Sequence, residues 1–162
     1  MLKPIDITVL AWLAAGSKER VTQSQVSHAL GISQSNVHRA LRQLHASSLL
    51  RGGRPQLLAM SEFLIHGVRY VYPPQLGAPA RGVVTAQVGD DVAIDNPLVW
   101  PCEAGTGFGT SLSPLHRSVP TTALANPGFH ELMSVIDVFR VGRARERVLA
   151  ERWLRATLEV PA

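Results

Sequence analysis

The chain has 162 residues, of which 46% are hydrophobic, enough for one compact domain or two small ones and too many for a disordered chain. Its single cysteine, Cys102, excludes an internal disulfide and a metal site built from several cysteines, and a reducing cytoplasm is the simplest setting. The net charge of +4 is unevenly distributed: residues 1–75 hold eight Lys or Arg against three acids, and residues 76–162 hold eight Arg against nine acids. A surface that binds phosphates therefore belongs to the first half.

The first predicted element is a helix that begins near Pro4 and ends at Gly16, because proline is favoured in the first turn of a helix and glycine just past its end. The apolar run over residues 7–15 is far too short to span a bilayer. Asp6 interrupts the apolar stretch, so a packed helix explains it better than a signal peptide does. The residues expected to bury against the next two helices are Val9, Leu10, Trp12 and Leu13.

Two short helices joined by a tight turn are predicted between residues 21 and 44. Thr22 and Gln25 have the spacing of a capping box for the first helix, and Ser33 is suited to cap the second. Gly31 lies between them, where the first helix needs a residue that tolerates a positive φ in order to end. Apolar residues at spacings of three and four give each helix one buried stripe. This layout is that of a helix-turn-helix, whose second helix lies in the DNA major groove.

The polar face of the second helix carries residue types that read base pairs. With Val37 turned inward, the residues on or beside the outer face are Gln34, Ser35, His38, Arg39, Arg42 and Gln43. Arg can contact both acceptors of guanine, Gln can pair with adenine, and Ser or His can contact a base edge or a phosphate. Residues 21–61 contain no acid, whereas an amphipathic hairpin without a nucleic-acid partner would usually include Glu. The pattern therefore favours DNA binding over a solvated hairpin.

A β-hairpin is predicted directly after the second helix, over residues 49–59. Two leucines lead into a two-glycine turn, and residues 56–59 return as a second short strand. Arg51 and Arg54 lie at its tip. Taken alone, the segment is more simply a surface hairpin with two solvated arginines. Its position after a helix-turn-helix instead favours a wing that touches phosphates or the minor groove.

Residues 4–60 resemble the winged helix-turn-helix of bacterial and archaeal transcription regulators of the MarR and IclR kind, most closely in the phrase LGISQSNVHRALRQLHASSLL. The resemblance implies duplex DNA binding, usually as a dimer on a two-fold site. It assigns base reading to Gln34, Ser35, His38 and Arg39, and the wing tip to residues 51–54. MarR-type proteins begin with an extra dimerisation helix, and almost nothing precedes Pro4 here, so the dimer interface is expected elsewhere. The full set of predicted DNA-contacting residues is Thr22, Ser33, Gln34, Ser35, Asn36, His38, Arg39, Arg42, Arg51 and Arg54.

A connector helix is predicted over residues 61–75, where Ser61 caps an apolar segment that ends before Pro73 and Pro74. Residues 73–127 then hold eight prolines and six glycines, which indicates extended chain and short strands rather than independent helices. The phrase GTGFG, at residues 105–109, lacks the Lys-Ser/Thr ending and the following helix of a phosphate-binding loop, so a turn or strand kink is expected. Trp100 and Phe108 are expected in the core rather than in a ligand pocket.

Two helices are predicted at the C-terminal end. The first begins with Asn126 and Pro127 as N-cap and first turn and ends at Gly142, and the second follows directly. A charged cluster lies around their junction and consists of Asp137, Arg140, Arg143, Glu146 and Arg147. Arginines on a buried side need anionic partners, because an unpaired buried charge is unfavourable. An internal salt-bridge network ranks first, a subunit interface second and an anionic ligand third.

A second resemblance covers the phrases HGVRYVYPP, PLHRSVP and ELMSVIDVFRVGRARERVLAERWL. They are similar to a family of prokaryotic winged-helix proteins found beside nucleotidyltransferase genes, in the style of toxin and antitoxin pairs. The resemblance implies a DNA-binding regulator or an antitoxin-like partner of a nucleotidyltransferase-like protein.

The sequence thus predicts an α+β, mainly α fold: a winged helix-turn-helix over residues 1–60, a connector over 61–75, and a region for dimerisation, sensing or partner binding over 76–162. That region combines a Pro/Gly-rich middle of short strands with a C-terminal helical pair. The predicted function is a cytoplasmic, homodimeric, sequence-specific regulator of transcription, with residues 33–45 in the major groove of double-stranded DNA and residues 49–59 as the wing. An antitoxin-like or adaptor protein is the alternative. No catalytic constellation stands in an interpretable setting, so an enzyme, a metal, a cofactor and membrane association are not expected.

Overall fold

The computed structural model describes residues 1–16, 18–89 and 96–162. Its elements, in chain order, are α1 (Pro4–Ala15), α2 (Gln23–Leu30), α3 (Gln34–Ala46), β1 (Leu50–Arg51), β2 (Arg54–Pro55), α4 (Leu57–His66), α5 (Val68–Val71), β3 (Leu76–Thr85), β4 (Leu98–Pro101), β5 (Gly107–Leu112), α6 (Val119–Ala125), α7 (Pro127–Val141) and α8 (Ala144–Thr157). This is an α+β, mainly α fold, as the sequence predicts.

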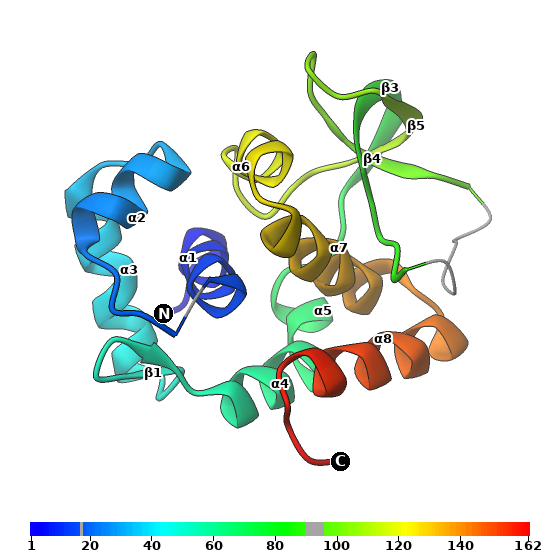
Figure 1. Ribbon diagram of the computed structural model, residues 1–162. Helices are drawn as coiled ribbons and strands as arrows, with labels where there is room; N and C mark the ends of the chain where they lie inside the picture. Colours follow the sequence, from blue (N-terminus) through cyan, green and yellow to red (C-terminus); the bar gives the residue numbers. More distant parts are fainter. Residues whose placement is uncertain (17, 90–95) are drawn as a thin grey trace.

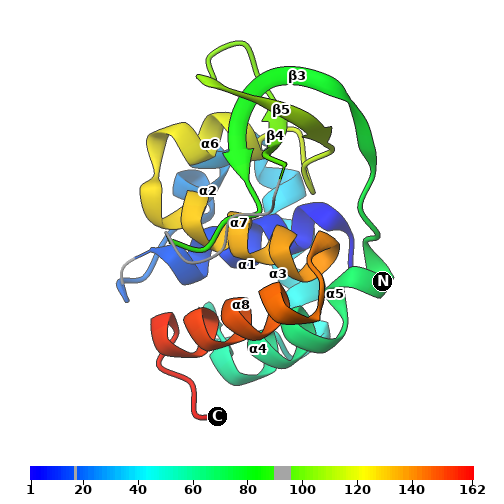
Figure 2. The same ribbon diagram turned by 90° about the vertical axis from the view of Figure 1, so that its right-hand side faces the viewer.

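Helix α7 is the element on which the two halves of the molecule meet. It packs against α1 of the N-terminal half and against α5, α6, α8 and β3 (Figure 1). Nine consecutive residues of α7, numbers 132–140, are buried, as expected of a helix enclosed on all sides rather than one with a single apolar stripe. Helices α4 and α8 lie side by side at the lower edge (Figure 2).

The first three helices begin and end where the local signals predict. α1 begins at Pro4 and is followed by Gly16. At the start of α2, the Gln25 N–H donates to Thr22 Oγ1 at 3.2 Å and the Thr22 N–H donates to Gln25 Oε1 at 2.8 Å, which confirms the capping box. Gly31 ends α2 with φ of 61°, and Ser33 Oγ accepts the Asn36 N–H at 3.1 Å to cap α3.

The hairpin after α3 is shorter than predicted. Only two pairs of residues face each other, Leu50 with Pro55 and Arg51 with Arg54, and both glycines of the turn have positive φ. The predicted return strand over residues 56–59 is wrong, because α4 begins at Leu57 with Gln56 as its N-cap. Apolar residues at helical spacing pack this segment on the core, and that packing prevails over the short strand pattern.

Ser61 is not a helix cap, contrary to prediction. It is buried inside α4, where its Oγ donates to the Leu57 carbonyl oxygen at 2.8 Å. A serine within a helix can satisfy its hydroxyl on the preceding turn, so the residue type alone does not mark a helix start. The predicted connector is in fact two helices, α4 and α5, divided at Gly67.

The Pro/Gly-rich middle forms a small closed barrel of three strands. β3 pairs antiparallel with β4 and with β5, and β4 and β5 pair in parallel. Its strands approach so closely that a Cβ on Gly82 would lie 1.9 Å from the Trp100 carbonyl oxygen, and one on Gly109 would lie 2.2 Å from that of Pro97. The glycines are therefore required for closure of the barrel, and GTGFG contributes to a strand rather than to a phosphate loop.

Two predictions for this middle region need correction. Phe108 is 69% exposed and not in the core, because Gly107 and Gly109 occupy the crowded side of β5 and the residue between them points the opposite way. Trp100 is fully buried, as predicted. Helix α6 occupies part of the segment predicted to lack independent helices. It begins with a proline in its first turn and buries Val119, Pro120 and Ala123.

Candidate DNA-binding surface

Helix α3 presents a continuous polar face to solvent. Val37, Ala40 and Leu44 are buried, and they hold the helix on α1 and α2. The exposed residues of the outer face are Gln34, Ser35, His38, Arg39 and Arg42. Because i, i+4 and i+7 or i+8 share one side of a helix, Gln34, His38 and Arg42 form one row with Ser35 and Arg39 beside it. The helix therefore offers amide, hydroxyl, imidazole and guanidinium groups along about two turns.

The remaining predicted residues lie at the edges of this face. Asn36 and Gln43 are half-buried, and Gln43 Oε1 accepts a hydrogen bond from the N-terminal amino group at 3.2 Å. Thr22 and Ser33 are exposed at the starts of α2 and α3, where their hydroxyl oxygens accept the capping N–H groups. Both therefore lie beside the unpaired N–H groups of a helix start, a favourable position for an anion.

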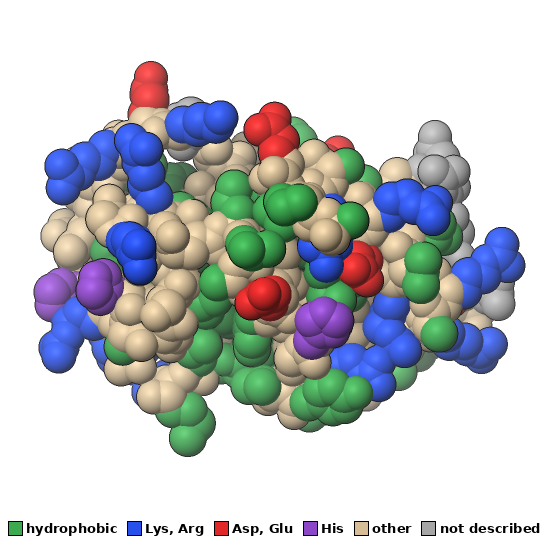
Figure 3. All heavy atoms as spheres, turned by 90° about the horizontal axis from the view of Figure 1, so that it is seen from below, with side chains coloured by type: hydrophobic (Ala, Val, Ile, Leu, Met, Phe, Trp, Pro, Cys, Tyr) green, Lys and Arg blue, Asp and Glu red, His purple; other side chains and the backbone are tan. Residues whose placement is uncertain are grey.

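The wing adds two cations beside α3. Arg51 and Arg54 face each other across the β1–β2 pair, and both are exposed. Figure 3 shows Lys and Arg side chains gathered at two ends of the molecule, one over the helix-turn-helix and wing and the other over the start of α8, with apolar side chains between them. The exposed arginines at the start of α8 are Arg143 and Arg145.

A buried carboxylate, Asp6, lies behind the polar face of α3. Its Oδ2 accepts the Lys3 N–H at 2.7 Å, and its side chain has no exposed surface. Burial raises the pKa of Asp6, while the Lys3 hydrogen bond and the charges of Arg39, Lys3 and the amino terminus oppose that rise. Sequence reasoning treated Asp6 only as a break in an apolar run. Its position three residues after Lys3, at the start of a helix, was the signal for a buried capping role.

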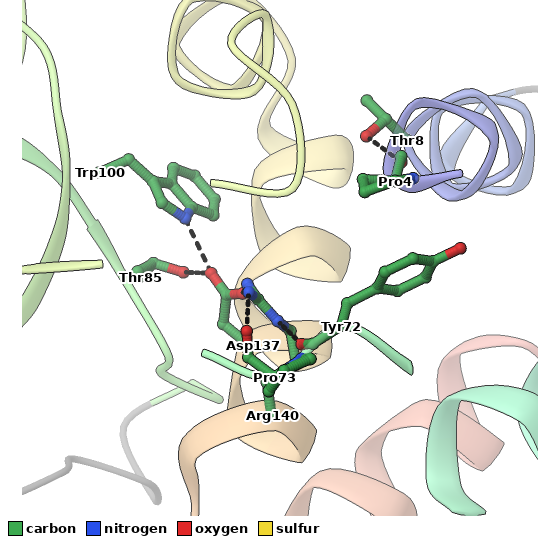
Figure 4. Close-up of polar contacts among 8 residues, drawn as sticks. All are labelled: Pro4, Thr8, Tyr72, Pro73, Thr85, Trp100, Asp137 and Arg140. Atoms are coloured by element: carbon green, nitrogen blue, oxygen red, sulfur yellow. Dashed lines mark hydrogen bonds and ion pairs between the residues drawn. The ribbon is translucent and has the colours of Figure 1, made fainter. Parts of the chain in front are cut away.

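The charged cluster of the C-terminal half is divided by the structure. Asp137 and Arg140 form a buried ion pair of 2.7 Å. Asp137 Oδ2 also accepts hydrogen bonds from Thr85 Oγ1 at 2.7 Å and Trp100 Nε1 at 2.8 Å (Figure 4). Burial raises the pKa of Asp137, and the Arg140 charge is the main influence that opposes this.

The other three members of the cluster lie outside this ion pair. Arg143 is exposed, Glu146 is half-buried, and Arg147 donates from Nη1 to the Gly142 carbonyl oxygen at 2.7 Å. Arg140 instead reaches back along the chain, from Nε to the Tyr72 carbonyl oxygen at 2.9 Å and from Nη2 to that of Pro73 at 3.4 Å. The buried pair thus fixes the segment between α5 and β3.

An exposed recognition helix, a capped helix before it and a basic hairpin after it together define a winged-helix DNA-binding domain. Residues 2–56 match the model of the MarR family, so this part of the chain is a MarR-family winged-helix domain. The match begins just before α1 and ends at the N-cap of α4, and the family resemblance predicted for this segment is confirmed. No curated protein and no solved structure matches the chain. The association with nucleotidyltransferase genes stays a prediction.

None of the helices in the described part of the chain has the length and hydropathy needed to cross a membrane.

Proposed function

We propose that this protein is a sequence-specific regulator of transcription that inserts α3 into the major groove of double-stranded DNA and lays the β1–β2 wing on the backbone or in the minor groove. The observation that carries the proposal is the exposed face of α3, which lacks acids and presents Arg39 and Arg42 within a MarR-family domain. Arginine at a base edge supplies discrimination, and arginine at a phosphate supplies affinity.

The contacts divide by position on this surface. Gln34, Ser35, His38 and Arg39 lie on the first two turns of α3, the part of a recognition helix that reaches base edges. Arg51 and Arg54 project from the wing, beyond the end of α3, and serve phosphates or the minor groove. Thr22, Ser33 and Asn36 lie at helix starts, where backbone N–H groups and the helix dipole favour a phosphate.

The proposal includes a homodimer that acts in the cytoplasm. A helix-turn-helix dimer places its two recognition helices about 34–36 Å apart, one turn of DNA, so that protein and operator share a two-fold axis. The C-terminal half supports this arrangement because it leaves the outer face of α3 and the wing arginines, Arg51 and Arg54, exposed to solvent. Sedimentation that shows a monomer both free and on DNA would contradict the dimer.

A binding titration tests the function. The protein is titrated against the DNA upstream of its own gene and against a scrambled duplex, at two salt concentrations. We expect tighter binding to the upstream DNA that persists at moderate salt, since base contacts are lost less with salt than phosphate contacts are. Arg145→Ala, at an exposed position in the first turn of α8, is the matched control and should leave both affinities unchanged. Equal, salt-sensitive binding to both duplexes would overturn sequence-specific recognition.

A further inference from the structure

One side of α4 is exposed to solvent along the whole helix. Leu58, Glu62 and His66 follow each other at intervals of four residues, so they share one side of the helix, and all three are exposed. Helix α5 comes directly after Gly67 and carries Tyr70, which is 71% exposed. The α4–α5 surface, as we call these residues, therefore has a leucine at one end, a tyrosine at the other, and an acid and an imidazole between them.

The tyrosine end of this surface gathers large apolar side chains that are left in solvent. Val71 is 52% exposed and Leu76 is 61% exposed. Single exposed apolar residues are ordinary on a protein surface, but three within seven residues of chain form a patch. The Arg69 guanidinium lies over the Tyr70 ring, 4.7 Å from its centroid, and so restrains the ring. Tyrosine and arginine are the residue types that contribute most often to binding between proteins.

A hollow lies beside the leucine end of the same surface, between the C-terminal end of α3, β1 and α4. Its volume is about 380 Å³, and its lining includes Leu57 and Leu58 together with the polar side chains of His45 and Glu62. A hollow of this size and mixed lining can receive one aromatic ring that carries a hydroxyl group. None of the four predicted base-reading residues of α3 lines it, so an occupant leaves them free for DNA.

The α4–α5 surface is complementary to itself under a two-fold rotation. In a two-fold contact every residue pair occurs twice, because the same surface is used by both copies. An axis between Glu62 and His66 places Tyr70 of each copy opposite Leu58 and the hollow of the other. Arg69, which lies over the tyrosine ring, then approaches the acid that lines the hollow. Apolar groups thus meet apolar groups, and opposite charges meet each other.

We propose that the α4–α5 surface is the interface between two copies of this chain, with Tyr70 of each copy in the hollow beside Leu58 of the other. The inference rests on the proposed function, because it gives the homodimer its location. A stable interface buries about 800 Å² on each partner and has an apolar centre with a polar rim. Figure 3 shows apolar side chains exposed between the two basic ends, on the side where α4 and α8 lie. Both basic ends therefore stay at the margins of such a contact.

Sedimentation equilibrium of the full chain over a range of concentrations tests the apolar contact. Tyr70→Ala removes the side chain that fills the hollow and should raise the dissociation constant of the dimer by about tenfold or more. Phe108→Ala is the matched control, because Phe108 is an aromatic residue of similar exposure, 69%, on β5. It should leave the dissociation constant unchanged. Equal dissociation constants for Tyr70→Ala and wild type would overturn the proposal.

A charge exchange tests the two-fold arrangement. Glu62→Lys and Arg69→Glu each place like charges opposite each other and should weaken the dimer by about tenfold, whereas the double variant restores opposite charges and should come within about threefold of wild type. Reversal is needed because neutralising an exposed ion pair changes little. Glu131→Lys, at an exposed position on α7, controls for a reversed charge elsewhere. A double variant as weak as the single variants would overturn the arrangement.

A cross-link between two variants tests which residues meet. The single native cysteine is first replaced by Cys102→Ser. In that background, a mixture of Leu58→Cys and Tyr70→Cys chains should form a disulfide-linked dimer on mild oxidation, in higher yield than either variant alone. Equal yields from the mixture and from the separate variants would contradict the contact between the two positions.

Failure of the homodimer and failure of this interface give different results. A protein that stays monomeric at every concentration, free and on DNA, overturns both, while the DNA titration still tests base reading by α3. A dimer that neither Tyr70→Ala nor the charge reversals weaken overturns the interface alone. Association beyond a dimer would mean that the tyrosine and the hollow meet head to tail in an open series, which also overturns the two-fold interface.

Discussion

Among the described residues, each half of the molecule buries one carboxylate, and the two differ in how fully their oxygens are hydrogen-bonded. Asp137 in the C-terminal half accepts hydrogen bonds from Thr85 and Trp100 and is paired with Arg140. Asp6 in the winged-helix half has one oxygen bonded to the Lys3 N–H and the other unpaired. The paired charge of Asp137 holds three elements together, whereas the burial of Asp6 is offset by only one hydrogen bond among the described residues.

The two carboxylates also differ in the elements that they connect. The Asp137 network joins β3, β4 and α7 and fixes the segment after α5, so it defines the frame that supports the winged helix. Asp6 lies on α1, which packs against both α3 and α7. The comparison therefore predicts that loss of the Asp137 charge destabilises the fold, whereas loss of the Asp6 charge does not.

The largest expected effect comes from breaking the paired carboxylate. Asp137→Asn leaves the Arg140 guanidinium buried without a counter-charge, which should reduce the free energy of unfolding by about 3–5 kcal/mol. Denaturant titration measures it. Glu151→Gln removes an ion pair near the surface, a 3.0 Å contact with Arg155 on the partly exposed side of α8, and should change stability by less than about 0.5 kcal/mol. Similar reductions of the free energy of unfolding in Asp137→Asn and Glu151→Gln would show that the Asp137 network stabilises the fold no more than a surface ion pair does.

A substitution at Gly82, in the three-stranded barrel, is a second test of the structure around Asp137. A Cβ at Gly82 would lie 1.9 Å from the Trp100 carbonyl oxygen, so Gly82→Ala must separate β3 from β4 and disturb the tryptophan that donates to Asp137. Overpacking of this kind reduces stability by about 1–3 kcal/mol. Gly77→Ala, in the same strand, is the matched control, because its nearest neighbour would be 3.6 Å away. Equal melting temperatures for the two variants would contradict the tight closure of the barrel.

The two halves also differ in how many of their features could be predicted from the sequence. The starts and ends of α1, α2 and α3 depend on residues three or four positions apart, such as Thr22 with Gln25, and these were predictable. The exposed face of α3 followed from helical spacing around Val37. All of these are local relations, in which a residue type and its neighbours determine the backbone.

What the sequence could not predict depends on contacts between distant residues. The Asp137 network joins positions 37 and 52 residues apart, and the barrel places Phe108 outward because its neighbouring glycines face the opposite strand. The start of α4 at Leu57 is set by packing on the core rather than by a cap. The burial of Asp6 was missed because it depends on how α1 packs against α3 and α7.

Within the DNA-binding half, the two kinds of arginine contact can be separated. Arg39→Ala should weaken binding to the cognate duplex by about 1–3 kcal/mol and relax the choice of base at one position. Arg51→Ala should weaken binding to cognate and scrambled DNA alike and reduce the slope of log affinity against log salt by about 1. Titrations of both variants over a series of salt concentrations measure this. An unchanged cognate affinity for Arg39→Ala would remove that residue from the reading surface.

The smallest expected effect concerns the half-paired carboxylate in the free protein. Burial raises the pKa of Asp6 in the folded protein above 3.8, so the ionised carboxylate is less favourable there than in the unfolded chain. The contribution of Asp6 to stability is therefore greatest at acid pH and is lost as pH rises through the folded-state pKa. Asp6→Asn should raise the melting temperature relative to wild type at pH 7, and the advantage should disappear near pH 3.

This advantage at neutral pH also reports on Arg39 without any DNA. The Arg39 charge favours the ionised carboxylate, so in an Arg39→Ala background the ionised form is less favourable and the gain from Asp6→Asn should be larger. Glu62→Gln, at an exposed position on α4, controls for the loss of one negative charge. A gain from Asp6→Asn that is the same at pH 3 and pH 7 would mean that packing, rather than charge, distinguishes the two buried carboxylates.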